Sequence, residues 1–420
     1  MSTLTVGKSL RYRTVTAALD EAQDGDTIMV DPGDYLDQPF LIKQSGLSII
    51  CPGGLQNPAK FGMTLRPHTN KAGKTHDWAS IDKGICTIRL RARDFYIEGF
   101  EFFNAKIGST YNGAGIRGQG NGLIVNKCIF HDNQNGILTH AQFVGDQGGL
   151  WIDPNSERRR TLAGHAIVTN STFFDNGDNG GLAHDVYCGP AAFQIVAHNN
   201  AKNCLAGHHF KFNMGGGIAL CYDNETPDDE EAETSCSADF DSGHALLLQN
   251  RMRKVNVTNP KSQANESKQI EMRNNREDAP LGNSFTAVDN FLESTVHKRG
   301  FFIRVDVAKA IKGDKTGIVP KPITGLIDRN TLCARRYMKQ GANGETVKDG
   351  VTYLDSPIRA PDTMQIGNNT VIAMDGSPIV TPAVPRASAF SRDSWRADTK
   401  AMLSAYRPEL LPVMDKLISE

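Results

Sequence analysis

Apolar residues return along the chain in a six-residue motif. Each copy has an apolar residue, two spacers, a small residue or Asn, one spacer and a second apolar residue. First residues of successive copies lie 28 to 51 positions apart. The copies are Ile97/Phe100/Phe102 (with Phe in the middle position), Val125/Cys128/Phe130, Val168/Ser171/Phe173, Val196/Asn199/Ala201, Leu247/Asn250/Met252, Ala287/Asn290/Leu292, Ile327/Asn330/Leu332 and Ile366/Asn369/Val371.

This motif predicts one coil of a parallel β-helix. Two inward apolar residues flank a tight bend, and Asn tolerates the left-handed conformation that the bend requires. Asn side chains stacked in successive coils can also hydrogen-bond along the axis. Unequal spacing follows if loops are inserted into some coils. A β-sandwich is the alternative, but it would show hairpin turns at short, regular intervals. We therefore expect an all-β, single-stranded right-handed parallel β-helix over residues 27–390, with Val125, Val168 and Val196 in one internal column.

The two ends of the chain have helical patterns. Val15, Ala18, Leu19 and Ala22 are spaced as one face of an amphipathic helix, which predicts a short capping helix within an N-terminal cap over residues 1–26. Residues 391–420 are expected to form a C-terminal helical tail that caps the far end or packs along the side. Two long insertions, 141–163 and 214–244, are expected to leave the coils.

Bulk properties narrow the class of protein. The chain has 420 residues, which exceeds the usual size of a single compact core, but a solenoid escapes that limit because each coil packs only on its neighbours. A net charge of −1 without a basic run argues against nucleic-acid binding. No segment is expected to insert into a membrane, and the start of the chain lacks a signal-peptide pattern. Eight Cys without a C-x-x-C pair or zinc-like spacing predict folding in a reducing cytoplasm, with virion association or release as open alternatives.

Three segments resemble the pectin-lyase-like family of right-handed parallel β-helices, which includes pectate lyases and phage tailspikes: TVTAALDEAQDGDTIMVDPGDY, DFYIEGFEFFNA and GLIVNKCIFHDNQNGI. The pair His184-Asp185-Val186-Tyr187 and Gly207-His208-His209-Phe210-Lys211 is most similar to uncharacterised bacterial parallel β-helix repeat proteins. The resemblance implies the fold, on which lyases, hydrolases, epimerases and non-catalytic tailspikes all occur. The pectate lyase signature W-I-D-H is incomplete, because Pro154 follows Trp151-Ile152-Asp153 in place of His.

A candidate site comes from counting forward from the motifs. His140, His184 and Lys211 lie 15 or 16 residues after Val125, Val168 and Val196, which predicts one strand line across adjacent coils. Strand alternation directs Val186, Phe210 and Phe212 inward and their neighbours outward, whereas the facing of His184 and His208 stays open. The candidate catalytic residues are His184, Asp185, Tyr187, His209 and Lys211. The candidate substrate-binding residues are His140, Arg158, Arg159, His208 and Asn213.

Such a patch suits cleavage of an acidic glycan by a lyase. A lyase neutralises a uronate carboxylate, removes the C5 proton and protonates the leaving oxygen. Lys211 is a candidate for the first role, a neutral His or a Lys of lowered pKa for the second, and Tyr187 or a His for the third. A hydrolase would need two carboxyl groups at a defined separation. A purely structural ladder of partly buried His is the further alternative.

The acidic stretch 222–242 is expected to be an exposed, mobile loop, because it has few apolar groups to offset ordering entropy. A Ca²⁺ site there is an open alternative, although no D-x-D-x-D-G pattern occurs and no cofactor is required by the sequence. The sequence thus favours a polysaccharide-binding enzyme, lyase-like or a depolymerase. The alternative is a non-catalytic tailspike-type adhesin or structural protein that binds surface glycan, with homotrimer or virion partners.

Overall fold

The computed structural model describes most of the chain. The described residues are 1–64, 68–69, 75–76, 84–89, 92–106, 113–139, 164–177, 183–205, 207–213, 217–227, 236–254, 268–274, 282–295, 301–307, 321–336, 339–340, 346–347, 358–373 and 392–419.

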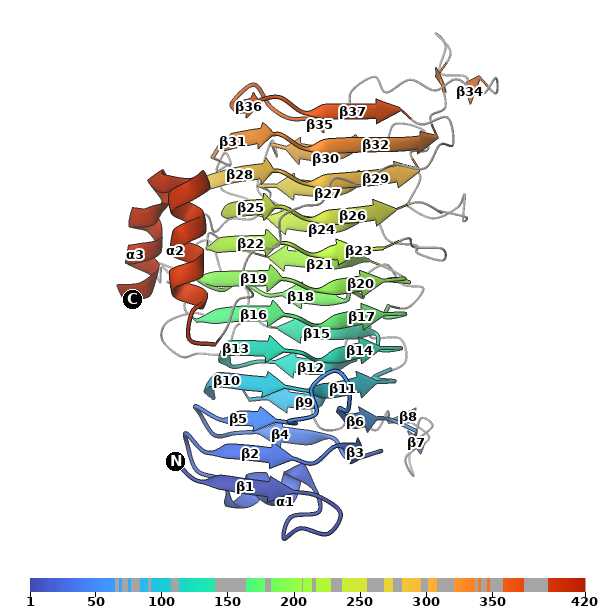
Figure 1. Cartoon of the computed structure of the whole chain (residues 1–420), viewed down its shortest axis with the longest axis vertical. Coiled ribbons are helices and arrows are strands. Elements are labelled where there is room, and N and C mark those ends of the chain that lie inside the picture. Colours follow the sequence, from blue (N-terminus) through green and yellow to red (C-terminus); the bar gives the residue numbers. More distant parts are fainter. Residues whose placement is uncertain are drawn as a thin grey trace.

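Three long parallel sheets run the length of the molecule (Figure 1). Sheet A consists of β1 (Thr3–Val6), β2 (Thr27–Val30), β5 (Ser48–Ile50), β10 (Arg93–Glu98), β13 (Asn121–Asn126), β16 (His165–Thr169), β19 (Phe193–Ala197), β22 (Ile218–Tyr222), β25 (His244–Leu248), β28 (Asn283–Val288), β31 (Ile323–Asp328) and β36 (Met364–Ile366). Sheet B consists of β3 (Gly33–Asp34), β6 (Ala59–Gly62), β11 (Phe100–Phe103), β14 (Ile129–His131), β17 (Thr172–Phe174), β20 (Asn200–Lys202), β23 (Glu225–Thr226), β26 (Arg251–Lys254), β29 (Phe291–Thr295), β32 (Thr331–Arg336) and β37 (Thr370–Ala373).

Sheet C consists of β4 (Phe40–Ile42), β9 (Gly84–Ile88), β12 (Ala114–Gly118), β15 (Asn135–Thr139), β18 (Val186–Cys188), β21 (His208–Asn213), β24 (Cys236–Asp241), β27 (Lys268–Arg273), β30 (Phe301–Asp306) and β35 (Ile358–Arg359). Two short antiparallel hairpins, β7 (His68–Thr69) with β8 (Thr75–His76) and β33 (Lys339–Gln340) with β34 (Thr346–Val347), lie outside these sheets. The chain passes from sheet A to B to C and back, so each strand pairs with its equivalent in the next coil. The fold is a right-handed parallel β-helix, as predicted.

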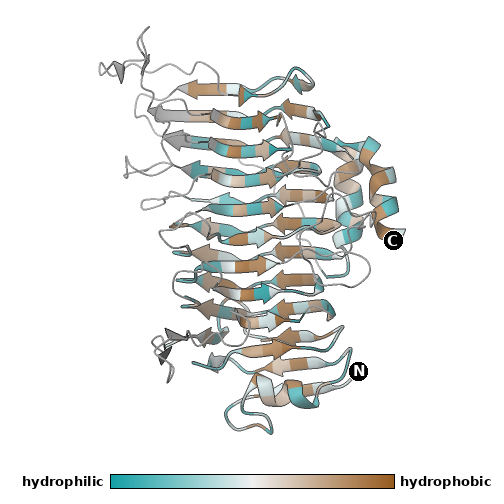
Figure 2. Ribbon diagram, turned by 180° about the vertical axis from the view of Figure 1, so that it is seen from behind, coloured by the Kyte–Doolittle hydropathy of each residue, from teal (hydrophilic) through white to brown (hydrophobic). Residues whose placement is uncertain are grey.

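The interior is a set of stacked apolar columns. Val125 pairs with Val168, and Val168 with Val196, and all three are buried, which confirms the predicted internal column. In sheet B, Phe130 stacks on Phe173 with ring centroids 4.9 Å apart. Figure 2 shows the result as hydrophobic bands that cross successive strands. Each coil therefore buries its inward face only against its neighbours.

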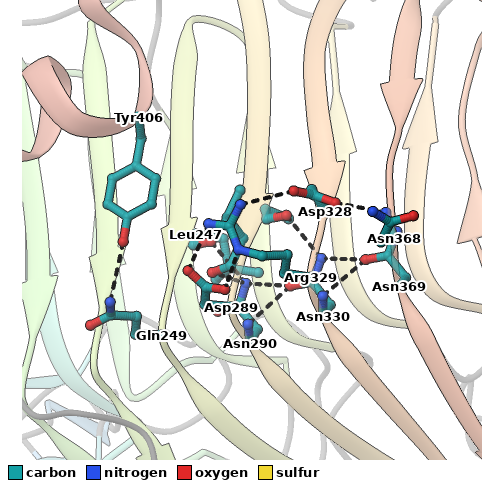
Figure 3. Close-up of polar contacts among 12 residues, drawn as sticks. Leu247, Gln249, Asp289, Asn290, Asp328, Arg329, Asn330, Asn368, Asn369 and Tyr406 are labelled. Atoms are coloured by element: carbon teal, nitrogen blue, oxygen red, sulfur yellow. Dashed lines mark hydrogen bonds and ion pairs between the residues drawn. The ribbon is translucent and has the colours of Figure 1, made fainter.

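The Asn residues of the motif stabilise the bend between sheets A and B. The Asn290 amide donates to Asn330 Oδ1 (2.8 Å), and Asn330 donates to Asn369 Oδ1 (2.8 Å), which forms the expected ladder along the axis (Figure 3). The left-handed conformation, however, belongs to the preceding residue, such as Asp289 (φ 58°) or Arg329 (φ 52°). The Asn occupies this position because its amide satisfies backbone groups of adjacent coils rather than because of its own φ.

The expected insertion at 214–244 is wrong for its described residues. These described residues form strands of sheets A, B and C and so belong to a coil of the β-helix: Ile218–Tyr222, Glu225–Thr226 and Cys236–Asp241. Its motif is Cys221/Asn224/Thr226, in which Thr replaces the second apolar residue and hides the repeat. The expected exposed acidic loop is likewise wrong for Tyr222 and for residues 236–242, which are buried. Residues 141–163 and 228–235 lie outside the described residues.

Both ends carry helices. Helix α1 (Val15–Glu21) occupies the predicted segment and contacts β1, β2 and β4, but its function as a cap stays a prediction. Because β1 already pairs with β2, sheet A begins within the expected N-terminal cap. The C-terminal helices lie along the outer face of sheet A (Figure 1): α2 (Trp395–Tyr406), a 3₁₀ turn (Pro408–Leu410) and α3 (Leu411–Ser419). Of the two expected placements, the tail therefore packs along the side and does not cap the far end. None of the helices in the described part of the chain is long and apolar enough to cross a membrane.

Candidate functional site

The outer face of sheet C carries a row of polar side chains. Lys211 pairs in register with Tyr187 and Asp239, and Asp239 with Glu271. These residues alternate with the inward Phe210, Ala238 and Ile270, so they share the outer face. The predicted strand line differs in detail, because Lys211 aligns with Tyr187 and Leu138 instead of His184 and His140. Turns of different length between sheets B and C cause this shift.

Lys211 lies at the centre of an ion network. Its Nζ contacts Asp239 and Asp241 (2.7 Å to Asp241 Oδ2), and Arg273 also contacts both carboxylates, at 2.7 Å and 3.3 Å. Only 8% of the Lys211 side chain is exposed, against 32% of Arg273. Lys211 is thus a nearly buried cation held by two carboxylates, and Arg273 is the more accessible positive charge.

Burial and neighbouring charges set the protonation states of this network. Burial alone would lower the pKa of Lys211, but attraction by Asp239 and Asp241 outweighs it, so the pKa is raised. Burial would raise the pKa of Asp239, yet Lys211, His208 and Arg273 together hold it well below its usual range. Lys211 is thus a permanent cation near neutral pH and is wrong as a proton-accepting base.

His208 lies beside this network at the start of β21. Its Nε2 is 3.1 Å from Asp239 Oδ2, and its Nδ1 is 3.0 Å from Cys236 Sγ. Burial lowers the pKa of His208 despite the opposing charge of Asp239, and burial with the nearby His208 and Lys211 lowers that of His184 further. The two imidazoles stack with centroids 5.0 Å apart. Both are therefore neutral at pH 7, which is the state a general base requires.

Asp185 and His209, which strand alternation directs outward, are not exposed. Both are fully buried, and His209 Nδ1 lies 2.6 Å from Asp185 Oδ2. Asp185 Oδ1 accepts a hydrogen bond from the Asn176 amide (2.9 Å). Asp185 immediately precedes β18 and His209 is the second residue of β21, near the corner where the chain enters sheet C, and the corner residues Asn176 and Cys204 lie against them. Asp185 and His209 are therefore not part of an exposed surface, and the catalytic roles of the five candidate residues stay predictions.

The remaining candidates divide between the described and undescribed parts of the chain. Tyr187 is half-buried, and its hydroxyl accepts a hydrogen bond from Asn213 Nδ2 (3.0 Å), which places both beside Lys211. His140, Arg158 and Arg159 lie outside the described residues.

Four residues that contact Lys211, Asp239 or His208 escaped the sequence prediction: Asp239, Asp241, Arg273 and Cys236. The signal was present, because CSADFD alternates inward Ala238 and Phe240 with outward Asp239 and Asp241, as HFKFN does one coil earlier. Treating 214–244 as an insertion removed that strand from consideration.

Two groups of side chains have ligand atoms close enough to share a metal ion: Asp185, Cys204 and His209, and His208, Cys236 and Asp239. Within the described residues, the acidic side chains of β24 pair with Lys211 and Arg273, so this part of the predicted acidic stretch does not resemble a Ca²⁺ site.

Comparisons with known proteins find similar folds at low sequence identity. No protein-family model and no curated protein matches the sequence. Among solved structures, a pectin methylesterase from Erwinia chrysanthemi is 9% identical, with 95% of this chain and 94% of that chain covered and a TM-score of 0.34. A GH136 lacto-N-biosidase from Eubacterium ramulus is 12% identical (89% and 68% covered, TM-score 0.43). A PL6 alginate lyase in complex with a trisaccharide is 11% identical (89% and 86% covered, TM-score 0.39). The parallel β-helix itself is established by this chain's own strand pairing.

Proposed function

We propose that this protein binds an acidic polysaccharide on the outer face of sheet C and cleaves it by a lyase-type elimination. The observation that carries the proposal is a neutral His208 beside two positively charged side chains, Lys211 and Arg273, which both contact Asp239. Elimination from a uronate needs this combination, because a cation must stabilise the carboxylate while a neutral base removes the C5 proton.

The residues take different roles in this proposal. Arg273, the more exposed cation, pairs with the uronate carboxylate, and Lys211 positions Asp239 and Asp241. His208 donates its Nε2 proton to Asp239, so Nδ1 is the proton acceptor, and the Cys236 thiol, 3.0 Å from Nδ1, turns away when the substrate binds. The Tyr187 hydroxyl, oriented by Asn213, protonates the leaving glycosidic oxygen. Because the pKa of His208 is lowered, the base stays competent at neutral pH and loses activity only in acid, below its ordinary value of about 6.5.

The test is a panel of uronate-containing and neutral polysaccharides, read by the ultraviolet absorbance of unsaturated uronates. We expect His208→Ala to lower kcat by on the order of a hundredfold or more. Arg273→Ala should raise KM for uronates. The difference in KM from the wild type should shrink at high salt, because salt screens the attraction between Arg273 and the uronate carboxylate. The matched control is Arg359→Ala, an exposed Arg of the same sheet paired with Asp306 away from His208; it should behave as wild type.

Other outcomes would contradict the proposal in distinct ways. Glycan binding without any unsaturated product would indicate a non-catalytic glycan-binding protein. Equal activity of the His208→Ala and Arg359→Ala variants would remove His208 from the mechanism. Absence of binding to every glycan would leave a structural β-helix.

A further inference from the structure

The corner between sheets B and C contains a second ladder of polar side chains. The equivalent positions stand three residues after the inward residue of successive sheet B strands and hold Ala105, Asn133, Asn176 and Cys204; the ladder is made by the two Asn side chains. Asn133 Nδ2 donates to Phe102 O (2.9 Å), and Asn133 Oδ1 accepts from the Ala105 backbone N–H (2.9 Å). Asn176 repeats these contacts one coil later, with Phe130 O and the Asn133 backbone N–H. An Asn at this position therefore satisfies backbone groups of the coil before it.

The ladder changes its chemistry at the next coil. Cys204 replaces Asn, and next to it lie Asp185 and His209. The carboxylate, thiol and imidazole each have an atom within 4.8 Å of the others, and all three residues are fully buried. In place of the two backbone contacts that Asn133 and Asn176 each make, the Cys204 thiol donates to His208 O (3.5 Å), so the Asn ladder ends at this coil. A departure from a local structural rule is expected at a functional site, where the residue is chosen for its chemistry.

We infer that Asp185, Cys204 and His209 bind one divalent transition-metal ion of the zinc class. A thiolate, an imidazole and a carboxylate are the ligand types that Zn²⁺ accepts, whereas Ca²⁺ and Mg²⁺ require oxygen ligands. A dication with a thiolate, a carboxylate and a neutral imidazole has no net charge, which lowers the cost of burying these groups. The second oxygen of Asp185 is held by the Asn176 amide, and hydrogen bonds of this kind orient metal ligands.

Metal binding replaces a proton at this corner. His209 Nδ1 and Asp185 Oδ2 are 2.6 Å apart, a hydrogen-bond distance. Two bonds of about 2.0–2.2 Å to one tetrahedral ion require these atoms to separate to roughly 3.3 Å, which a small side-chain rotation supplies. The ion displaces the shared proton and the Cys204 thiol proton, so affinity falls as pH decreases.

The second cluster, His208, Cys236 and Asp239, is less suited to a cation. Asp239 already contacts Lys211 and Arg273, and both positive charges would repel the ion. The two clusters share no residue, so a substitution in one cluster serves as the control for zinc binding by the other. Metal content is also measured without glycan, so this inference and the proposed lyase activity succeed or fail separately.

The experiment measures zinc in the full-length protein after equilibration with equimolar ZnSO₄ and passage over a desalting column. We expect about one zinc per chain in the wild type and in Cys236→Ser. Cys204→Asn restores the residue type of the two preceding coils, so the variant should fold, as checked by circular dichroism. It should retain at most about one tenth of the zinc that the wild type retains. Co²⁺ in place of Zn²⁺ should give a thiolate charge-transfer absorption that is absent from Cys204→Asn.

Three results would overturn the inference. One is a wild type without retained zinc; another is zinc lost in Cys236→Ser but kept in folded Cys204→Asn. The third is equal zinc in all three proteins that mild chelation removes equally. If Cys204→Asn does not fold, Asp185→Asn provides the same comparison, because it keeps the size of the side chain and removes its charge.

Discussion

Replacement of Lys211 by Met tests whether the charge network of sheet C is a buried, mutually dependent unit. Met has nearly the length of Lys without the charge, so the substitution removes the cation and little volume. Asp239 would then keep its contacts with Arg273 and His208, and Asp241 would keep its contact with Arg273. Removal of one partner from a buried pair typically costs about 3–5 kcal/mol, because the other charge remains buried without compensation. Since Arg273 stays, we expect the lower end of this range, about 3 kcal/mol.

The loss should depend on pH in a defined direction. The pKa of Asp239 is lowered in the folded protein, so its contribution to stability is present above the unfolded value of about 3.9 and is lost as pH falls towards the folded pKa. Lys211 has a raised pKa, so its own contribution is complete at neutral pH and is lost only in strong alkali. The difference between wild type and Lys211→Met should therefore be largest near pH 7 and shrink below about pH 4, where Asp239 takes up a proton in the unfolded chain but not in the folded wild type.

The assay is urea unfolding followed by circular dichroism at pH 7 and at acidic pH values. The matched control is Lys127→Met, because Lys127 contacts Glu98 at 2.9 Å but is half exposed. That variant should lose no more than about 1 kcal/mol. A loss of less than 1 kcal/mol for Lys211→Met, or a loss that is the same at pH 3 and pH 7, would refute the reasoning.

Two further substitutions test the parts that hold the coils together. Asn250→Ala should lower the free energy of unfolding by at least about 2 kcal/mol, because Asn250 Oδ1 accepts from the Asn224 backbone and amide, and its own amide donates to Asn290. The control Asn200→Ala, at an exposed position, should change the free energy of unfolding by less than about 0.5 kcal/mol in the same urea titration. Equal losses in the two variants would contradict a stabilising role of the Asn ladder. Leu403→Ala should cost about 2–4 kcal/mol, because this buried side chain of α2 packs on sheet A, whereas Ile418→Ala, on the exposed side of α3, should cost under 1 kcal/mol in thermal unfolding. A Leu403→Ala variant as stable as wild type would mean that the C-terminal helices contribute little to the fold.

The amino-acid sequence by itself determined the fold of this protein. Val125, Val168 and Val196 form one column because each begins the same six-residue motif, and an inward apolar residue has nowhere else to be buried in a coil. The hydrogen-bonded stack of Asn side chains was also predictable from the sequence, because a bend that is repeated in every coil places identical side chains above one another. The terminal helix was visible from its apolar spacing, but its position along sheet A depended on which outer face was apolar, and that required the register of all strands.

The site was decided by tertiary structure. Strand alternation placed Tyr187, Lys211 and Asn213 on the outer face, but it could not predict that Asp185 and His209 are fully buried, because their burial depends on residues of adjacent coils. Lys211 was identified as a charged group at the site, yet its burial depended on Asp239 and Asp241 from a strand in the next coil. One Thr in place of an apolar residue, Thr226, hid that coil from the pattern. Sequence periodicity fixes what faces inward, because burial is a property of every coil; which outward charges meet depends on register and turn length, which only the folded chain sets.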